Sequence, residues 1–337
     1  MTASEAEADG VLRADLVLSG GGVKGVSLAG AAAAITEAGY RPQRISGTSA
    51  GGIVGAMIAS GLVGEELGSA ARAIDYASFL DPATLDWVPL LGSNDGIYRG
   101  EAAREWIAEM LAERGVRTFA DLADPDPSLP PERRYKLVVT CADLTLGRMV
   151  RLPWDYRAVY GLDPDEQAVA DAVRASMSVP LLFQPVKLPN RLSGKTSTLV
   201  DGGIVSNFPI DSLDRTDGQP PRWPTFGVTI MPDAPGPSGT FLPGWLRPLI
   251  PKPVRLLEEV AIVSLVGRDQ AYLNQPPVRA RAITVDSHAA GFLDFHLSAE
   301  QVERLYDDGY QAGQRFLASW DWQEYLRLYR PERGRPT

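Results

Sequence analysis

The chain has 337 residues, of which 45% are hydrophobic, and its formal net charge is −9 at pH 7. This length suits one large domain or two, and the acidic balance argues against a nucleic-acid partner and against broad electrostatic attraction to anionic membranes. A single cysteine, Cys141, excludes an intramolecular disulfide, and two isolated histidines add no cluster of metal ligands. We therefore expect neither a metal nor another cofactor.

Residues 1–12 are predicted to be a disordered tail. The first ten are small and acidic, without the positively charged and apolar regions of a signal peptide. The longest apolar stretch, Val26 to Ile35, has about ten residues, whereas a membrane span needs about 20. We expect a cytoplasmic protein whose membrane contact is at most peripheral.

A glycine-rich turn lies between a predicted strand, residues 15–19, and a predicted helix, residues 26–38. The turn consists of Gly20, Gly21, Gly22, Val23, Lys24 and Gly25. Its bare backbone amides suit an anion. The dinucleotide fingerprint G-x-G-x-x-G also fits, but the acidic residue that it needs about 20 positions later is absent from 44–47, and no Gly-Lys-Ser/Thr completes a phosphate loop. We predict an oxyanion hole instead. Lys24 either binds a phosphate or forms a surface salt bridge; the sequence leaves both open.

The next predicted strand ends in the pattern G-x-S-x-G, made by Gly47, Thr48, Ser49, Ala50 and Gly51. A sharp strand-to-helix turn of this kind exposes the serine hydroxyl, and the flanking glycines let the backbone fold tightly. The amides at the start of the following helix, residues 50–60, point towards the place where an oxyanion would form. Ser49 is therefore the candidate nucleophile.

Strands and helices alternate along the rest of the chain. Further predicted helices cover 65–75, 100–114 and 166–176, a strand pair covers 135–142 and 148–152, another strand covers 226–231, and a loop covers 81–94. This alternation predicts a largely parallel sheet covered on both faces, with active residues at the carboxyl ends of its strands.

A third motif, Asp201-Gly202-Gly203, follows a strand-like run that begins at Thr198. An aspartate at the end of a strand can act as the base for Ser49. An aspartate before two glycines is also a common turn former.

Together, the three segments resemble those of the patatin-like phospholipase family. The glycine-rich turn matches its oxyanion motif, the pentapeptide around Ser49 its nucleophile elbow, and Asp201-Gly202-Gly203 its catalytic Asp-Gly-Gly. Weaker matches are Ala175-Ser176-Met177-Ser178-Val179-Pro180, Phe183, Pro185, Asn207 and Pro209. The resemblance covers about residues 14–232 and implies a three-layer α/β/α sandwich with a mostly parallel central sheet.

The resemblance further implies a serine lipid acyl hydrolase of the phospholipase A or lysophospholipase type, acting on a lipid or phospholipid substrate. A dyad of Ser49 and Asp201 would cleave fatty-acyl esters through an acyl-enzyme. Two alternatives stay open: an acyltransferase that uses the same acyl-enzyme, and a catalytically silent lipid-binding module.

A histidine triad is formally open as well, through His288 or His296. His288 is predicted to lie in a surface loop, and His296 lies just before a helix that starts at Ser298. Neither lies at the end of a predicted strand, so we expect the dyad.

The catalytic domain is predicted to cover residues 13–325, and residues 326–337 are predicted to be a disordered tail. Residues 232–253 combine seven prolines with bulky apolar residues, which rules out a regular helix or strand. This segment is either a long surface loop or an apolar lid beside the site. A core helix is predicted over 254–272.

Overall fold

The computed structural model describes residues 10–81, 96–231 and 270–330. Nearly all of the loop predicted at 81–94, the proline-rich segment 232–253 and most of the helix predicted over 254–272 lie outside the described residues. Residues 1–9 and 331–337 of the two predicted tails lie outside them as well.

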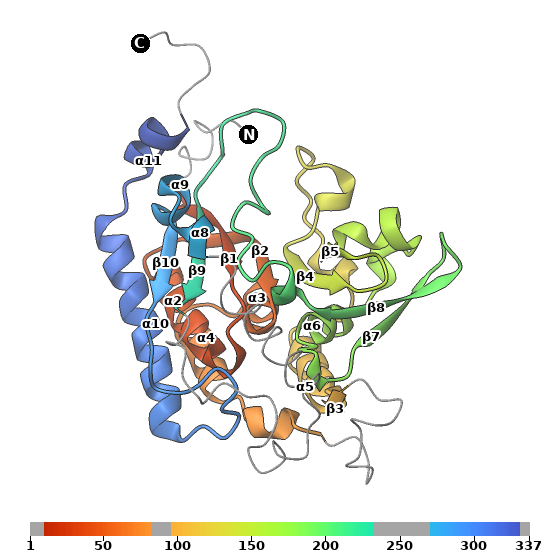
Figure 1. Cartoon of the computed structure of the whole chain (residues 1–337). Coiled ribbons are helices and arrows are strands. Elements are labelled where there is room, and N and C mark those ends of the chain that lie inside the picture. The colour runs from red at the N-terminus through yellow and green to blue at the C-terminus, as the bar shows by residue number, and fades with distance from the viewer. Residues whose placement is uncertain (1–9, 82–95, 232–269, 331–337) are drawn as a thin grey trace.

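A central eight-stranded sheet has helices on both sides (Figure 1). Its strands follow the order β10-β9-β1-β2-β4-β8-β7, and β5 pairs with β4. Their bounds are β1 Arg13–Leu18, β2 Arg41–Thr48, β4 Leu137–Asp143, β5 Arg148–Leu152, β7 Val186–Asn190, β8 Lys195–Asp201, β9 Thr225–Ile230 and β10 Ala282–Val285. The first five strands in that order are parallel, whereas β8, β7 and β5 run antiparallel to their partners. The predicted fold class, a mostly parallel central sheet between layers of helices, is confirmed.

The register of the strands brings the three sequence motifs to one edge of this sheet. Leu18 of β1 lies opposite Gly47 of β2, and Thr48 lies opposite Thr140 of β4. One residue further along β4, Cys141 lies opposite Asp201 at the end of β8. The glycine-rich turn, the serine turn and the aspartate therefore meet, although long stretches of sequence separate them.

The remaining elements surround this sheet. The helices are α2 Gly25–Glu37, α3 Ala50–Ala59, α4 Gly64–Arg72, α5 Glu101–Ala112, α6 Val169–Ser176, α8 Gln270–Leu273, α9 Pro276–Arg279, α10 Ala299–Ser319 and α11 Trp322–Tyr329. Short 3-10 turns are η1 Gly22–Lys24, η2 Tyr76–Phe79, η3 Phe119–Leu122, η4 Pro131–Arg133, η6 Pro164–Glu166 and η7 Gly202–Ile204, and η5 Tyr156–Tyr160 is a π-helix. A second small sheet pairs β3 Gly96–Tyr98 with β6 Leu181–Phe183.

Helix α2 is buried almost along its whole length because α10 packs on it. The two helices come close through small residues: a side chain at Gly30 would meet the backbone of Tyr306, and one at Gly309 would meet the backbone of Ser27. Ser298 caps α10 by accepting the amide of Gln301. The sequence predicted this start but not the length of α10.

The C-terminal boundary predicted at residue 325 is wrong, because α11 continues to Tyr329. Asp321 caps this helix, and Tyr325 is buried in a stack with Trp322. Arg330 then donates to Asp214. Aromatic burial and this ion pair hold five residues, 326–330, that the sequence had assigned to the tail.

Within residues 10–81, 96–231 and 270–330, none of the helices combines the length and the apolar character of a membrane span. No group of three or more His, Cys, Asp or Glu side chains there is placed to hold a metal ion.

The contact between α2 and α10 generates a stability prediction. Gly309→Val should lower the free energy of unfolding by about 1–3 kcal/mol, because its side chain would press on the carbonyl of Ser27 in an already packed interface. Gly291→Ala is the matched control, since a Cβ there meets nothing within 4 Å. Urea denaturation measures both variants, and equal stabilities would contradict this account of the interface.

Candidate active site

Ser49 lies at a strained turn between β2 and α3. Its φ of 53° and ψ of −122° are rare for a residue with a side chain. Gly51 permits the turn, because a side chain there would meet the backbone carbonyls of Leu18 and Ser19. The strand–turn–helix expected from the sequence is therefore present, and it packs directly on the end of β1.

Ser176 holds this turn, and the sequence did not assign it a role. The amide of Ser49 donates to Ser176 Oγ at 2.8 Å, and that hydroxyl donates to the carbonyl of Thr140 at 2.7 Å. One buried hydroxyl thus joins α6, β4 and the strained residue. The serine belongs to the segment 175–180 that resembled the family, but only the fold shows what it contacts.

Asp201 is fully buried at the end of β8. Its Oδ1 accepts the amide of Gly203 at 2.8 Å, and its own amide donates to the carbonyl of Ser178 at 2.9 Å. Burial raises the pKa of this carboxyl to about 7, against the smaller lowering effects of hydrogen bonding by Ser49 and by the Gly203 amide.

The contact between the predicted dyad partners is loose. The Ser49 side chain is near enough to lower the pKa of Asp201. Yet Asp201 Oδ2 makes no hydrogen bond of normal geometry to any described residue. Catalytic hydrogen bonds are often long in the absence of substrate and tighten when it binds.

The glycine-rich turn lies beside Ser49. A side chain at Gly20 would meet Asn207 Oδ1 and would lie 3.3 Å from Ser49 Cβ. The Gly20 amide donates to the carbonyl of Asn207 at 3.2 Å, so it is already used. The amides of Gly21 and Gly22 donate to no residue in the described part of the chain. Gly22 has a φ of +53°, which favours glycine.

Lys24 was expected either to bind a phosphate or to form a salt bridge at the surface, but its side chain is buried, with only 2% exposed. Its Nζ donates to the carbonyl of Ser287 at 2.9 Å, inside the protein. Ser287 in turn donates to Asp308 of α10 at 2.7 Å. Lys24 therefore joins the glycine-rich turn to the C-terminal part of the chain.

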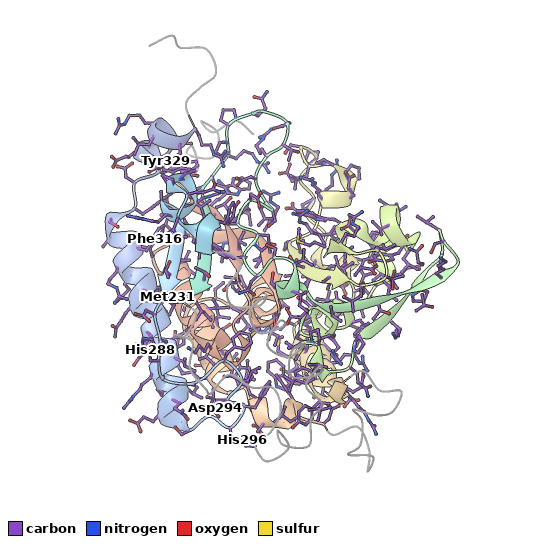
Figure 2. All side chains as sticks on the ribbon, viewed as in Figure 1. Met231, His288, Asp294, His296, Phe316 and Tyr329 are labelled. Atoms are coloured by element: carbon purple, nitrogen blue, oxygen red, sulfur yellow. The ribbon has the colours of Figure 1, made fainter. Side chains whose placement is uncertain are left out.

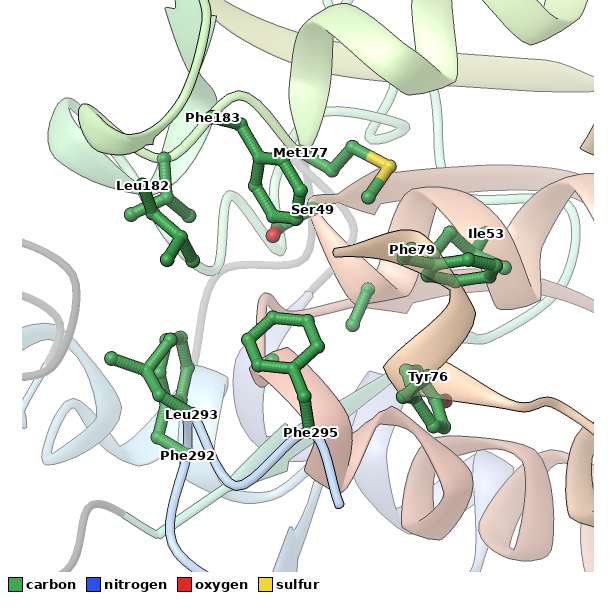
Figure 3. Close-up of a pocket in the computed structure, with 13 residues that line it drawn as sticks. Ser49, Ile53, Tyr76, Phe79, Met177, Leu182, Phe183, Phe292, Leu293 and Phe295 are labelled. Atoms are coloured by element: carbon green, nitrogen blue, oxygen red, sulfur yellow. The ribbon is translucent and has the colours of Figure 1, made fainter. Parts of the chain in front are cut away.

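An apolar pocket opens beside Ser49 and encloses about 390 Å³, part of which is open to solvent. Its lining consists of Gly22, Ser49, Ala50, Ile53, Tyr76, Phe79, Met177, Val179, Leu182, Phe183, Phe292, Leu293 and Phe295. Figure 3 shows the rings of Phe79, Phe183 and Phe295 around the space next to the Ser49 hydroxyl. Such a lining suits a hydrocarbon chain.

One wall of this pocket comes from the loop 286–297, which the sequence did not connect with the site. The carbonyl of Phe292 accepts the amide of Val23 at 3.2 Å, directly after Gly22. A side chain at Gly22 would meet the same carbonyl. The loop thus both lines the pocket and supports the turn, although no motif marks it in the sequence.

Neither histidine lines the pocket. His288 is exposed, as predicted, and its Nε2 lies 3.1 Å from Asp286 Oδ1. His296 is also exposed, and Figure 2 shows both on the segment between β10 and α10. The geometry gives no support to the triad.

The chain is similar to known proteins in sequence and in fold. The sequence model of the family described as patatin-like phospholipase matches residues 16–214. The protein YqhO of Bacillus subtilis strain 168 is 40% identical over 225 residues, which cover 65% of this chain and 71% of YqhO. The NTE family protein MT2641 of Mycobacterium tuberculosis strain CDC 1551 is 26% identical over 313 residues, 90% of this chain and 46% of its own length.

The chain therefore spans less than half of that mycobacterial relative. Among solved structures, VipD of Legionella pneumophila has a similar fold, with a TM-score of 0.56 at 17% identity, over 91% of this chain and 67% of VipD. The family model covers more than half of the chain and includes the glycine-rich turn, Ser49 and Asp201. This chain belongs to the patatin-like phospholipase family.

Proposed function

We propose that this protein is a serine acyl hydrolase that cleaves fatty-acyl esters of phospholipids or lysophospholipids through a dyad of Ser49 and Asp201. Membership of the patatin-like phospholipase family supports a lipid hydrolase. The observation that carries the finer proposal is the fully buried Asp201 carboxyl beside Ser49, with a pKa raised to about 7. A base with a pKa near the working pH is well matched to proton transfer.

In the proposed reaction, Ser49 Oγ attacks the ester carbonyl carbon while its proton passes to Asp201. The tetrahedral intermediate then expels the alcohol of the lipid, which takes the proton from Asp201, and the acyl group stays on Ser49. A water molecule gives its proton to Asp201 and attacks the acyl-enzyme. The fatty acid leaves as the proton returns to Ser49 Oγ, and the dyad is restored.

The negative charge of the intermediate needs donors that are already in place. The Gly21 and Gly22 amides are the candidates in the glycine-rich turn, since the Gly20 amide bonds to Asn207. Ala50 begins α3, and the first amides of a helix have no partner within the helix. Together with the positive end of the α3 dipole, these groups would stabilise the oxyanion.

The acyl chain of the substrate would lie in the apolar pocket, where only Ser49 and Tyr76 carry hydroxyl groups among the lining side chains. Removing a hydrocarbon chain from water contributes about 0.8 kcal/mol per buried CH2 group. The pocket therefore favours fatty-acyl esters over small polar esters.

Replacement of the dyad tests the reaction. Ser49→Ala and Asp201→Asn should each lower hydrolysis of a short-chain nitrophenyl ester by several orders of magnitude, and the double variant should be little worse, because the two groups act as one unit. His288→Ala and His296→Ala are the controls and should keep most of the activity. An intact-mass spectrum after fluorophosphonate treatment should show one adduct, absent from Ser49→Ala. Near-normal turnover in Ser49→Ala, or a histidine variant as inactive as it, would refute the dyad.

The pKa of Asp201 predicts the pH dependence. A general base works only when ionised, so kcat/KM should rise about tenfold per pH unit below pH 7 and level off above it. Stopped assays between pH 4.5 and 9 with a substrate that has no titrating group measure the profile. A profile that is flat through pH 7, with an ordinary carboxylate inflection near pH 4, would show that Asp201 is not the desolvated base.

Stability should respond to pH with the opposite sign. The folded-state pKa of Asp201 is about 7, above the usual value of 3.8, so the folded protein retains a proton that the unfolded chain releases between those values. This stabilising contribution is complete below about pH 4 and is lost as the pH rises through 7. Asp201→Asn cannot ionise, and its Oδ1 can still accept the Gly203 amide. The Tm advantage of Asp201→Asn over the natural protein should therefore be larger at pH 8 than at pH 4.5; an equal difference at both values would contradict this.

A further inference from the structure

Two neighbouring turns expose leucines at the β8 side of the sheet. Residues 144–147 join β4 to β5, and residues 191–194 join β7 to β8. Leu144, Leu146 and Leu192 are 57%, 41% and 65% exposed. They are three of the seven large hydrophobic side chains that are exposed in the described part of the chain, so exposed apolar surface gathers here.

The longer stretches that contain these two turns are basic in an otherwise acidic protein. Residues 144–154 and 184–199 contain no Asp or Glu, whereas the whole chain carries a net charge of −9. Their five cations are Arg148, Arg151, Lys187, Arg191 and Lys195. Arg148 lies 3.8 Å from Asp155, but Arg191 and Lys195 form no ion pair with a described residue. Local charge at these turns is therefore opposite to the net charge of the molecule.

Hydrogen bonds attach each of the two turns to neighbouring parts of the protein. The Leu144 amide donates to the carbonyl of Thr198 on β8, and Thr145 Oγ1 accepts the Thr198 amide, both at 2.9 Å. The Arg191 amide donates to the carbonyl of Tyr160 at 2.8 Å, and the Tyr160 hydroxyl donates to Asp143 at 2.8 Å. The first turn is thus bonded to β8, and Tyr160 links the second turn to Asp143, the residue directly before the first turn.

The turns lie beyond the edge of the sheet that carries Ser49. Thr140 of β4 is level with Thr48, and β4 continues past it to Asp143 before the first turn. Because β8 is antiparallel, Lys195 at its start lies six residues, or roughly 20 Å, beyond Asp201 in the same direction. Figure 1 shows the β7–β8 hairpin projecting from the body.

We propose that these two turns form a docking surface for an anionic phospholipid bilayer, which presents the substrate of the proposed hydrolase to Ser49. The exposed leucines would enter the acyl boundary, while Arg148, Arg191 and Lys195 contact phosphate groups of the lipids. Charge complementarity at this one surface accounts for membrane contact by a protein whose net charge repels anionic lipids.

The test is sedimentation of the full chain with vesicles, in the Ser49→Ala background so that no lipid is consumed. One vesicle set contains phosphatidylcholine and phosphatidylglycerol, and the other phosphatidylcholine alone. We expect at least about tenfold stronger partitioning to the anionic set, falling as salt rises. Arg191→Gln with Lys195→Gln, and separately Leu144→Ser with Leu192→Ser, should each lower partitioning by about tenfold.

Val63→Ser with Leu328→Ser is the matched control, because both side chains are exposed elsewhere in the structure, and it should bind as strongly as the parent. Equal loss in this control, unchanged binding in the turn variants, or equal binding to both vesicle sets would overturn the proposal. In the active protein, the turn variants should keep hydrolysis of the soluble nitrophenyl ester and lose hydrolysis of vesicle lipid. A chain that binds anionic vesicles through the turns but hydrolyses no ester would refute the proposed function and leave the docking surface standing.

Discussion

The arrangement of the site depends on keeping the Asp201 carboxyl out of water beside a strained serine. Burial alone would raise the pKa of Asp201 further, and the Gly203 amide together with Ser49 brings it back to about 7. Two hydrogen bonds fix the backbone around this pair: the Ser49 amide bonds to Ser176, and the Asp201 amide bonds to the Ser178 carbonyl. Both serines lie in or directly after α6, so the position of one helix sets the relation between the two members of the proposed dyad.

A strained Ser49 and a desolvated Asp201 carboxyl persist only if the surrounding structure is rigid. Arg174 provides part of this rigidity, because its buried guanidinium donates to Ser178 Oγ at 2.5 Å and to the carbonyl of Gln184 at 2.8 Å. Burial lowers the pKa of Arg174, which shows that the charge is held at a cost in solvation. Within the sheet, a buried pair of Arg44 and Asp15 joins β2 to β1. The Arg44–Asp15 pair lies where the register of β1 and β2 shifts, between Ala14 and Leu16.

The turns and strands around the site could be predicted from the sequence because each depends on residues that are close together in the chain. The glycines within residues 20–25 and 47–51 predict tight turns, and the apolar runs before these turns form the buried strands β1 and β2. The structure also shows what occupies the place where a dinucleotide site would need an acidic residue. Arg44 lies there, and it pairs with Asp15. Local sequence could not predict the contacts of three other parts of the site, namely Lys24, Ser176 and the loop 286–297. Their partners are distant in sequence, and 263 residues separate Lys24 from Ser287, so only the fold brings them together.

The loop 286–297 has two separate roles at the site: its backbone supports the glycine-rich turn, and its side chains line the apolar pocket. Residues 286–297 lie outside the segment that matches the family, yet they line the pocket and hold the glycine-rich turn. Backbone atoms hold the glycine-rich turn, because the Phe292 carbonyl accepts the Val23 amide and lies against Gly22. The Phe292 side chain, in contrast, lines the pocket. A change of that side chain would therefore alter the size of the apolar pocket while the carbonyl continued to support the turn, whereas any side chain at Gly22 would push the loop away. The backbone of Phe292 thus supports the glycine-rich turn independently of the side chain that shapes the pocket.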